Sequence, residues 1–268
     1  MPELPEVENI VMSVATLLEN QQIEFIEILD SVVVSGDIDL FRSNVEGQRI
    51  KHLNRKGKYI IFEMEKGYVI LHLRMTGQLL KGDLEDKHTH LKIHLANGKI
   101  VSYRDIRKFG GFFFLEKEQL NAYFESRLGL EPLKMTYEEF NGALKKAKGS
   151  IKKILLDQKI IAGIGNIYAD EILFYAGIHP QKNVEYFSKR RKEKLYEGIY
   201  VVLQTAIEEG GSSIRDYVNS EGKEGGFQDQ HQVYGRKGKG CYVCKTPLKK
   251  ITVAGRTTVY CPQCQTKR

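Results

Sequence analysis

The order of hydrophobic and polar positions divides the chain into an amphipathic start, a long alternating stretch and a helical remainder. Apolar residues recur at helical spacing between residues 5 and 21, which predicts an amphipathic helix. From about residue 22 to residue 115 apolar and polar positions alternate, as in strands with one buried face. The turn signals Glu65-Lys66-Gly67 and Asn97-Gly98 divide this stretch into hairpins. Short strands at this spacing predict a β-sandwich.

Helical signals take over after Phe114. The segment Glu131-Pro132-Leu133 is typical of a connection between domains. We expect a short helix over residues 150–158, a second that Asn166 caps and that runs to residue 176, and a long third helix capped by Ser188. The pattern therefore predicts an α+β protein with an N-terminal β-sandwich and a helical region after it.

Residues 210–226 contain five glycines and few apolar side chains. Such a segment is either disordered or a lid that closes over a ligand. From residue 233 onward, short strand patterns surround four cysteines. We therefore expect three domains, with boundaries at residues 1–131, 132–232 and 233–268.

Composition and charge indicate a globular protein with an acidic partner. The chain has 268 residues, is 41% hydrophobic and 28% charged, and carries a net charge of +7. Nucleic acid is the commonest partner of such a basic chain. The last 39 residues contain no Asp or Glu. They carry Arg236, Lys237, Lys239, Lys245, Lys249, Lys250, Arg256, Lys267 and Arg268. No apolar run is long enough for a membrane span and no signal peptide is evident, so we expect a cytosolic protein.

The four cysteines form two knuckles, Cys241-x-x-Cys244 and Cys261-x-x-Cys264, with sixteen residues between them. Four thiolates at this spacing are typical of a tetrahedral zinc site, and disulfides are disfavoured in a reducing compartment. Four protein ligands leave no open position on the metal, which indicates one structural Zn²⁺ ion.

The first residues carry a possible catalytic pair. If Met1 is removed, Pro2 presents a secondary amine, and Glu3 follows as a carboxylic acid. An unprotonated amine can attack a carbonyl-like carbon and form a Schiff base, with the acid as proton donor. The alternative is that Pro5 and the nearby acids only mark the start of a helix.

Two further segments have a structural and a functional interpretation. Residues 162–166, Ala-Gly-Ile-Gly-Asn, join two predicted helices, either as an ordinary helix hairpin or as a phosphate-binding turn. Met75, Arg107 and Phe109 lie at strand ends, either as ordinary strand residues or as a wedge that enters a base stack in place of a flipped nucleotide.

Taken together, these segments resemble the bacterial formamidopyrimidine-DNA glycosylases along essentially the whole chain. The matching segments are residues 2–8, 57–59, 72–75, 107–110, 155–158, 163–168, 234–235 and 254–256, together with the cysteine quartet. The resemblance implies a helix-two-turn-helix region, a zinc hairpin and a monomer that binds double-stranded DNA containing an oxidised base.

The resemblance also implies a role for each matched residue. Pro2 would attack C1′ of the damaged nucleotide and Glu3 would donate the proton. Lys58 would act in the first elimination and hold phosphate, and Arg256 would hold the lesion phosphate and assist the second. The DNA contacts would be His72, Met75, His90, Arg107, Phe109, Lys152, Lys153, Asn166 and Tyr234, with Arg107 pairing to the orphaned cytosine. The loop from residue 210 would cover a flipped 8-oxoguanine.

Some positions depart from the family pattern. Thr257 stands where many members have Gly, which predicts an altered hairpin tip, and Thr76 stands where others carry Glu or Ser. Asp216 and residues 221–225 of the lid are also atypical. Two rival hypotheses are a glycosylase for oxidised pyrimidines that resembles endonuclease VIII, and a DNA-binding paralogue without activity. Leu4 argues against the first, and the intact catalytic set argues against the second.

Overall fold

The computed structural model describes residues 1–214 and 217–266. Three positions discussed above, Asp216 of the lid and the C-terminal Lys267 and Arg268, lie outside the described residues. The chain forms two compact units. Unit 1 contains Met1–Glu125 and Glu209–Gly226, and unit 2 contains Ser126–Glu208 and Phe227–Arg268.

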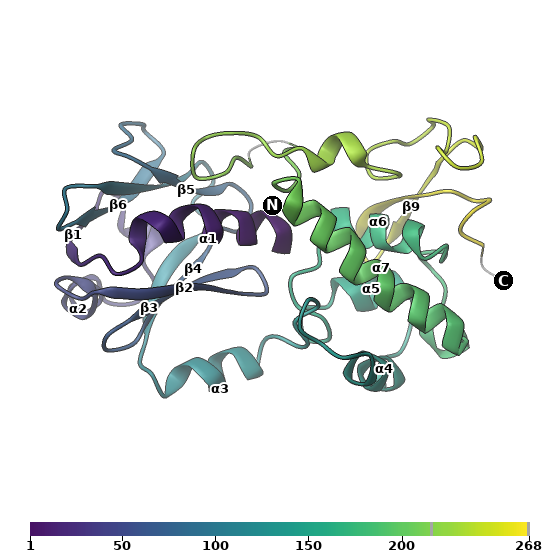
Figure 1. Ribbon diagram of the computed structural model, residues 1–268, viewed down its shortest axis with the longest axis horizontal. Coiled ribbons are helices and arrows are strands. Elements are labelled where there is room, and N and C mark those ends of the chain that lie inside the picture. Colours follow the sequence, from purple (N-terminus) through teal and green to yellow (C-terminus); the bar gives the residue numbers. More distant parts are fainter. Residues whose placement is uncertain (215–216, 267–268) are drawn as a thin grey trace. The chain divides into compact units, whose positions relative to one another are not determined.

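The alternating stretch of the sequence folds into two four-stranded antiparallel sheets, which confirms the predicted β-sandwich (Figure 1). One sheet has the order β1 (Ile23–Ile28), β6 (Thr89–Leu95), β7 (Ile100–Asp105), β5 (Gly77–Lys81). The other has the order β2 (Ile50–Lys56), β3 (Tyr59–Met64), β4 (Tyr68–His72), β8 (Gly111–Leu115). Both predicted hairpins are present, because β3 pairs with β4 around Gly67 and β6 pairs with β7 around Gly98.

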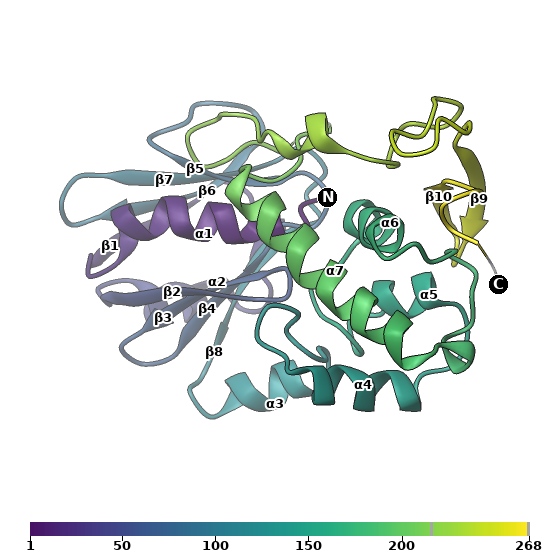
Figure 2. The same cartoon turned by 45° about the vertical axis from the view of Figure 1, so that its right-hand side comes forward.

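Helix α1 (Leu4–Leu18) lies between the two sheets in both views (Figures 1 and 2). Its apolar face joins side chains of both sheets in one core. The buried residues of this face are Val7, Ile10, Val11, Val14 and Leu18. Burial of such side chains contributes about 1.5–3 kcal/mol each, so the N-terminus is held firmly. The helix ends at Leu18 and not at residue 21 as predicted, because Glu19 is extended and Asn20 adopts φ 62°.

The remaining helices of unit 1 are short. They are η1 (Ser31–Val33), α2 (Ile38–Val45) and α3 (Gln119–Glu125). The glycine-rich loop, residues 209–226, belongs to this unit, although the sequence placed it in the middle domain. Its distal part lies on β5, where Lys81 N donates to Ser220 O at 2.9 Å. The described part of the loop around Ser220 therefore lies on the sandwich.

Unit 2 contains the predicted helices and the C-terminal hairpin (Figure 2). Its elements are α4 (Tyr137–Lys146), α5 (Ile151–Leu156), α6 (Asn166–Tyr175), η2 (Val184–Tyr186), α7 (Lys189–Glu208), η3 (Phe227–Gln230), β9 (Lys249–Val253) and β10 (Arg256–Tyr260). Helix α6 packs against α5, α7 and β10. Among the described residues, no helix is both long and apolar enough to span a membrane.

The predicted cap of α6 is wrong by one residue. Gly165 is the N-cap and Asn166 is the first helical residue. The Asn166 side chain is used elsewhere, since its Nδ2 donates to Thr257 O at 3.0 Å. The turn before α6 is instead supported by Gln158, which donates to Ile164 O at 2.8 Å and accepts from Gly163 N at 2.9 Å.

Candidate active site and nucleic-acid interface

The predicted catalytic pair lies buried at the start of α1. Pro2 is buried and Glu3 is only 3% exposed. Glu3 N donates to Glu6 Oε2 at 2.7 Å, as in a capping box. The second carboxylate oxygen of Glu6 accepts from Ser212 N at 2.7 Å. One buried carboxylate therefore fixes both the helix start that bears the pair and the first residues of the loop 209–226.

Lys58 lies in the tight turn between β2 and β3, and it is 6% exposed. The turn is fixed to the same helix through Arg55, whose side chain is 4% exposed. Arg55 Nε contacts Glu8 Oε2 of α1 at 2.5 Å, and Arg55 Nη1 donates to Gly57 O at 3.0 Å. The acid, the N-terminal residue and this lysine are therefore all positioned by α1.

The two predicted phosphate-binding histidines of unit 1 are partnered within the fold. His72 Nδ1 accepts from Arg74 N at 2.9 Å. Burial, with the charges of Arg74 and Lys58, lowers the pKa of His72 to about 3, so its ring is neutral at pH 7. His90 is 3% exposed and its Nε2 lies 2.8 Å from Asp105 O. Their phosphate contacts stay predictions.

The predicted wedge residues are exposed on two connections of the sandwich. Met75 is 38% exposed and Phe109 is 58% exposed. The guanidinium of Arg107 lies over the Phe109 ring, 4.5 Å from its centroid. The neighbouring Arg74 and Lys108 have φ of 51° and 55°, which is strained for residues with a Cβ. Backbone strain of this kind clusters at active sites and ligand-binding segments, and the wedge role of these residues stays a prediction.

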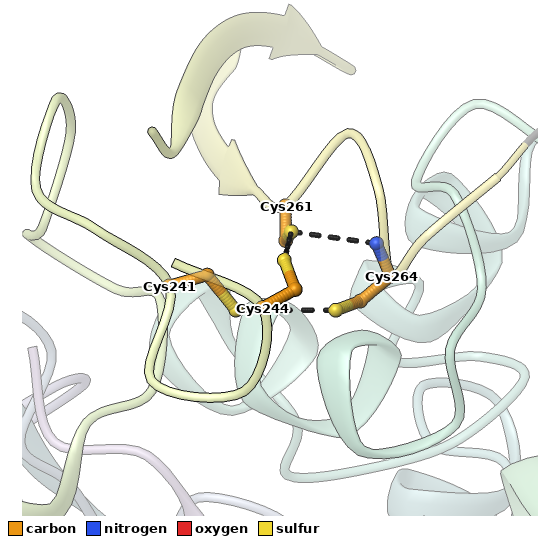
Figure 3. Close-up of side chains that lie close together, drawn as sticks. All are labelled: Cys241, Cys244, Cys261 and Cys264. Carbon is orange, nitrogen blue, oxygen red and sulfur yellow. Dashed lines mark hydrogen bonds between the residues drawn. The ribbon is translucent and has the colours of Figure 1, made fainter. Parts of the chain in front are cut away.

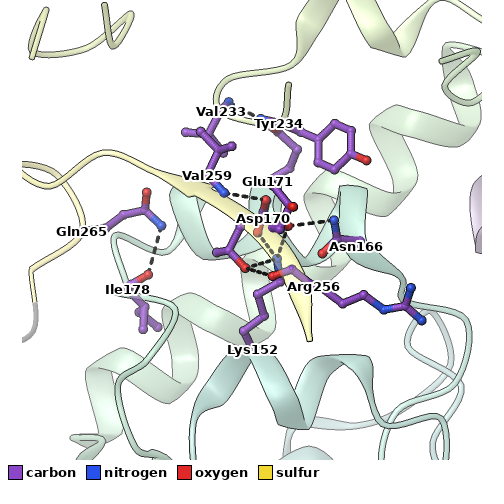
Figure 4. A network of polar contacts seen from close by, with 12 residues as sticks. Lys152, Asn166, Asp170, Glu171, Ile178, Val233, Tyr234, Arg256, Val259 and Gln265 are labelled. Carbon is purple, nitrogen blue, oxygen red and sulfur yellow. Dashed lines mark hydrogen bonds and ion pairs between the residues drawn. The ribbon is translucent and has the colours of Figure 1, made fainter. Parts of the chain in front are cut away.

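Lys152 occupies the centre of a buried network in unit 2 (Figure 4). Its side chain is fully buried, with Nζ 2.5 Å from Asp170 Oδ1 and 2.7 Å from Thr258 Oγ1. Asp170 Oδ2 accepts from Val259 N at 3.0 Å. Burial raises the pKa of Asp170 to about 6, although the Lys152 charge opposes the shift. The Lys152 ammonium, which was predicted to bind phosphate, thus joins α5 and α6 to β10. Lys153, the next residue in the sequence, is exposed.

The next residue of α6, Glu171, holds the segment that carries Tyr234. Its carboxylate accepts from the backbone N of Gln232, Val233 and Tyr234 at 2.8, 3.0 and 2.8 Å. Burial raises the pKa of Glu171 above its usual range. Asn166, Tyr234 and Arg256 are therefore all fixed around α6, and the Arg256 side chain extends away from the buried cluster (Figure 4).

The hairpin tip differs from the expectation based on Thr257. The left-handed residues are Ala254 and Gly255, with φ of 50° and 71°. Thr257 lies within β10 and pairs with Thr252 of β9. A β-branched residue suits a strand, so Thr257 causes no strain at the tip.

Removal of Asp170 is expected to destabilise unit 2 strongly. Asp170→Asn leaves the buried Lys152 charge without its counter-ion, which costs about 3–5 kcal/mol. The double variant Lys152→Met/Asp170→Leu should regain most of this loss, because no buried charge remains. Urea unfolding measures both changes. Glu193→Gln, which breaks the exposed 3.9 Å pair with Lys189, is the control and should cost less than about 0.5 kcal/mol. Equal effects of Asp170→Asn and Glu193→Gln would contradict this account of the network.

The four cysteine side chains point toward one another (Figure 3). Their Sγ atoms all lie within 4.8 Å, with 3.9 Å between Cys241 and Cys264 and 3.4 Å between Cys244 and Cys261. Tetrahedral zinc with Zn–S bonds of about 2.3 Å places its sulfurs about 3.8 Å apart. The quartet fits zinc in both donor type and spacing.

Comparison with known families agrees with this architecture in three consecutive parts of the chain. Residues 1–112 match the formamidopyrimidine-DNA glycosylase N-terminal domain, and residues 128–218 match the H2TH domain of the same glycosylases. Residues 238–267 match a zinc finger found in FPG and IleRS. The formamidopyrimidine-DNA glycosylase of Solibacter usitatus is 43% identical over 267 residues, covering 99% of each chain. The chain belongs to the formamidopyrimidine-DNA glycosylase family.

Other relatives of this glycosylase chain cover similar lengths. The formamidopyrimidine-DNA glycosylase of Streptococcus pyogenes serotype M3 is 40% identical over the full length of both chains. The Lactococcus lactis Fpg, solved in a complex with DNA containing an abasic site, superposes with a TM-score of 0.92 at 37% identity. That superposition covers 99% of this chain and 100% of the L. lactis chain. The zinc-finger match and the cysteine cluster together establish a structural zinc ion in this glycosylase.

Several positioning residues of the glycosylase site were not predicted from the sequence. Glu6 accepts from Glu3 N, Arg55 donates to Gly57 O beside Lys58, and Glu171 accepts from Tyr234 N. The spacing of Glu3 and Glu6 is that of a capping box, so this signal was available. The partners of Arg55 and Glu171 depend on tertiary packing and have no local signal.

Proposed function

We propose that this chain removes oxidised purines, 8-oxoguanine and formamidopyrimidines, from duplex DNA and then cleaves the strand by β,δ-elimination. Family membership establishes a base-excision-repair DNA glycosylase that acts on damaged DNA. The lesion class, the covalent step and the eliminations are the proposed part. A monomeric, cytoplasmic enzyme remains our prediction.

In the first step, the Pro2 nitrogen forms a bond to C1′ of the damaged nucleotide while the bond from C1′ to the base breaks, and the Glu3 carboxyl gives its proton to the leaving base. The Glu3 carboxylate then takes up the proton that the Pro2 nitrogen loses and passes it to the ring oxygen as the sugar ring opens, which leaves a Schiff base between Pro2 and C1′. The burial of Pro2 and Glu3 at the rigid start of α1 supports this step.

In the second step, the Schiff base acidifies the neighbouring sugar protons and the two phosphates leave in succession. Lys58 would act in the first elimination, and Arg256 would hold the lesion phosphate and assist the second. The burial of Lys58, in a turn that Arg55 joins to α1 through Gly57 and Glu8, supports its role. The exposure of Arg256 at the end of a well-anchored hairpin supports its contact with phosphate.

Base removal requires that the damaged nucleotide leave the helix, which costs a few kcal/mol. Met75, Arg107 and Phe109 would fill the space it leaves, with Arg107 facing the orphaned cytosine. Their exposure on strained connections of the sandwich supports this role. The net charge of +7 supports a grip on the phosphate backbone on both sides of the lesion.

The observation that carries the proposal is the buried Pro2-Glu3 pair clamped by Glu6 to the loop 209–226. This arrangement holds the N-terminal residue and the acid in fixed positions, as an N-terminal nucleophile requires. Oxidised pyrimidines remain a second candidate substrate, because the L. lactis Fpg has been solved with DNA containing an oxidised pyrimidine.

A panel of lesions tests the proposed function. The protein is incubated with duplexes that contain 8-oxoguanine opposite cytosine, an oxidised pyrimidine, an abasic site or no damage, each in the presence of borohydride. We expect covalent trapping on 8-oxoguanine and abasic duplexes and none on undamaged DNA. Preferential trapping on the pyrimidine lesion would favour the endonuclease VIII-like activity. No trapping on any duplex would refute the proposed activity through a Schiff base.

Displacement of the Lys58 turn is expected to slow strand cleavage. Arg55→Lys cannot maintain both the Glu8 and the Gly57 contacts, because lysine lacks the planar fork. A misplacement of this kind costs roughly 10- to 100-fold in rate. Gel assays on abasic duplexes measure the rate. Arg49→Lys, on an exposed arginine that contacts Asn20 O, is the control and should cleave normally.

A further inference from the structure

Thr76 belongs to the β4–β5 connection, one of the two connections that present the wedge. It directly follows Met75 and is 7% exposed. Its hydroxyl does not face solvent. It donates to Asp105 Oδ1 at 2.5 Å and accepts from Arg107 N at 3.1 Å. A side chain bonded in this way inside the fold cannot read a base.

The partner of Thr76, Asp105, is a fully buried carboxylate at the end of β7. Besides Thr76, it accepts from Arg107 N at 3.1 Å, from Gly110 N at 2.9 Å and from Tyr103 Oη at 3.2 Å. Burial alone raises the pKa of Asp105, but these hydrogen bonds, led by that from Thr76, bring it below its usual range. Asp105 is therefore a charged acceptor that organises the whole connection from residue 105 to residue 110.

The backbone of both connections also packs against one hydroxyl. A Cβ on Gly77 would lie 2.9 Å from Tyr103 Oη, and a Cβ on Gly110 would lie 2.2 Å from it. A Cβ on either glycine would also collide with the backbone of residues 72–73. The two connections thus touch without space for adjustment. Thr76 is the residue whose side chain hydrogen-bonds from one connection to the other.

We propose that Thr76 is a positioning residue that locks Met75 and Arg107 into a single rigid wedge and thereby sets the preference for the base opposite the lesion. The inference rests on the proposed role of Arg107 facing the orphaned base. A backbone N–H held by both Thr76 and Asp105 fixes the Cα of Arg107, and the strained φ of Lys108 beside it leaves few alternative conformations. When the backbone of Arg107 is already fixed, its guanidinium loses less conformational entropy on hydrogen-bonding to the nucleobase opposite the lesion.

Three variants separate the hydroxyl from the shape of the side chain. Thr76→Val keeps the shape and removes both hydrogen bonds, and Thr76→Ser keeps the hydroxyl. Thr89→Val is the matched control, since Thr89 is also buried, at 4% exposure, and its Oγ1 has no partner among the described residues. Each is also made in an Arg107→Ala background.

The readout is the ratio of dissociation constants for duplexes that carry an unreactive tetrahydrofuran abasic analogue opposite adenine and opposite cytosine. We expect the unaltered protein to favour cytosine, and Thr76→Val to reduce the ratio by about five- to tenfold, on the order of one lost hydrogen bond. Thr76→Ser and Thr89→Val should keep the ratio within about twofold, because neither removes a hydrogen bond to Arg107 N. In the Arg107→Ala background, Thr76→Val should change nothing further. Partial unfolding of a destabilised variant would lower the amount of binding-competent protein equally in both measurements, so the ratio of the two dissociation constants is unaffected.

The inference is overturned if Thr76→Val keeps the ratio, if Thr76→Ser loses it equally, if the loss persists without Arg107, or if the unaltered protein shows no preference. Borohydride trapping of the same preparations on an abasic duplex reports the proposed function separately. Absence of trapping in the unaltered protein refutes the proposed chemistry, whatever the binding ratio is.

Discussion

Protein with residues ahead of Pro2 is expected to form no borohydride-trapped complex, and the same protein cut to expose Pro2 is expected to form one. In the uncut chain the Pro2 nitrogen is an amide, whose lone pair is delocalised into the carbonyl, so it cannot attack C1′. The loss should be at least about a thousandfold, the scale of removing a catalytic nucleophile. A cleavable segment placed before Pro2 allows both forms to be prepared from one sample, with trapping on an abasic duplex as the measurement.

Two controls sharpen this experiment. Both forms should bind an unreactive abasic analogue, since the DNA contacts proposed for the wedge and the hairpin do not involve the amine. Pro2→Gly, cut in the same way, should bind DNA and lose trapping, because a flexible primary amine replaces a rigid ring. Equal trapping by the cut and uncut forms would rule out the terminal amine as the nucleophile.

Cys261→Ser is expected to release the zinc ion and to abolish tight DNA binding. Cys261 is buried, and its Sγ lies 3.4 Å from that of Cys244. The apparent free energy of a structural zinc site is roughly 10–16 kcal/mol, far more than a two-stranded hairpin can supply by itself. Without the metal, the hairpin is still anchored by the bonding of Thr257, Thr258 and Val259 to Asn166, Lys152 and Asp170, which is insufficient to present Arg256. Metal content and fluorescence anisotropy with an abasic-analogue duplex measure the two effects.

Thr252→Ser provides the matched control for the zinc variant, because Thr252 is exposed on β9 of the same hairpin. It should keep the metal and bind DNA normally. If the metal-free protein binds DNA as tightly as the zinc form, then the hairpin is not needed for binding and the coupling proposed here is incorrect.

The fold was predictable where the pattern is local. The alternation around Asn97-Gly98 and Gly67 identified the hairpins, and the paired knuckles identified the zinc site. The seat of the glycine-rich loop was not predictable, because Lys81 and Ser220 meet only through tertiary packing. Local composition cannot show which unit a polar loop joins.

The candidate site likewise divides into residues with a local sequence signal and contacts that depend on tertiary packing. Pro2, Glu3 and the wedge residues came from a resemblance between short segments, and their roles remain to be tested. Lys152 and Lys153 are chemically alike in the sequence, yet one is fully buried and the other exposed. Helical spacing places Lys152 three residues before the apolar Leu155 and so on the same face, which means that its burial could have been read from the period. The pairing of Lys152 with Asp170 could not, because it joins two separate helices.

The bond between Glu6 and Ser212 joins residues 206 positions apart, which has a consequence for how the enzyme matures. At about 5–20 residues per second, a ribosome needs roughly 10–40 s to reach the second residue after making the first. During this time the N-terminus has left the ribosome and its clamp cannot yet exist. A peptidase acting on nascent chains therefore meets Met1 before the finished fold encloses the residue behind it, so the order of synthesis itself allows the amine to be uncovered first.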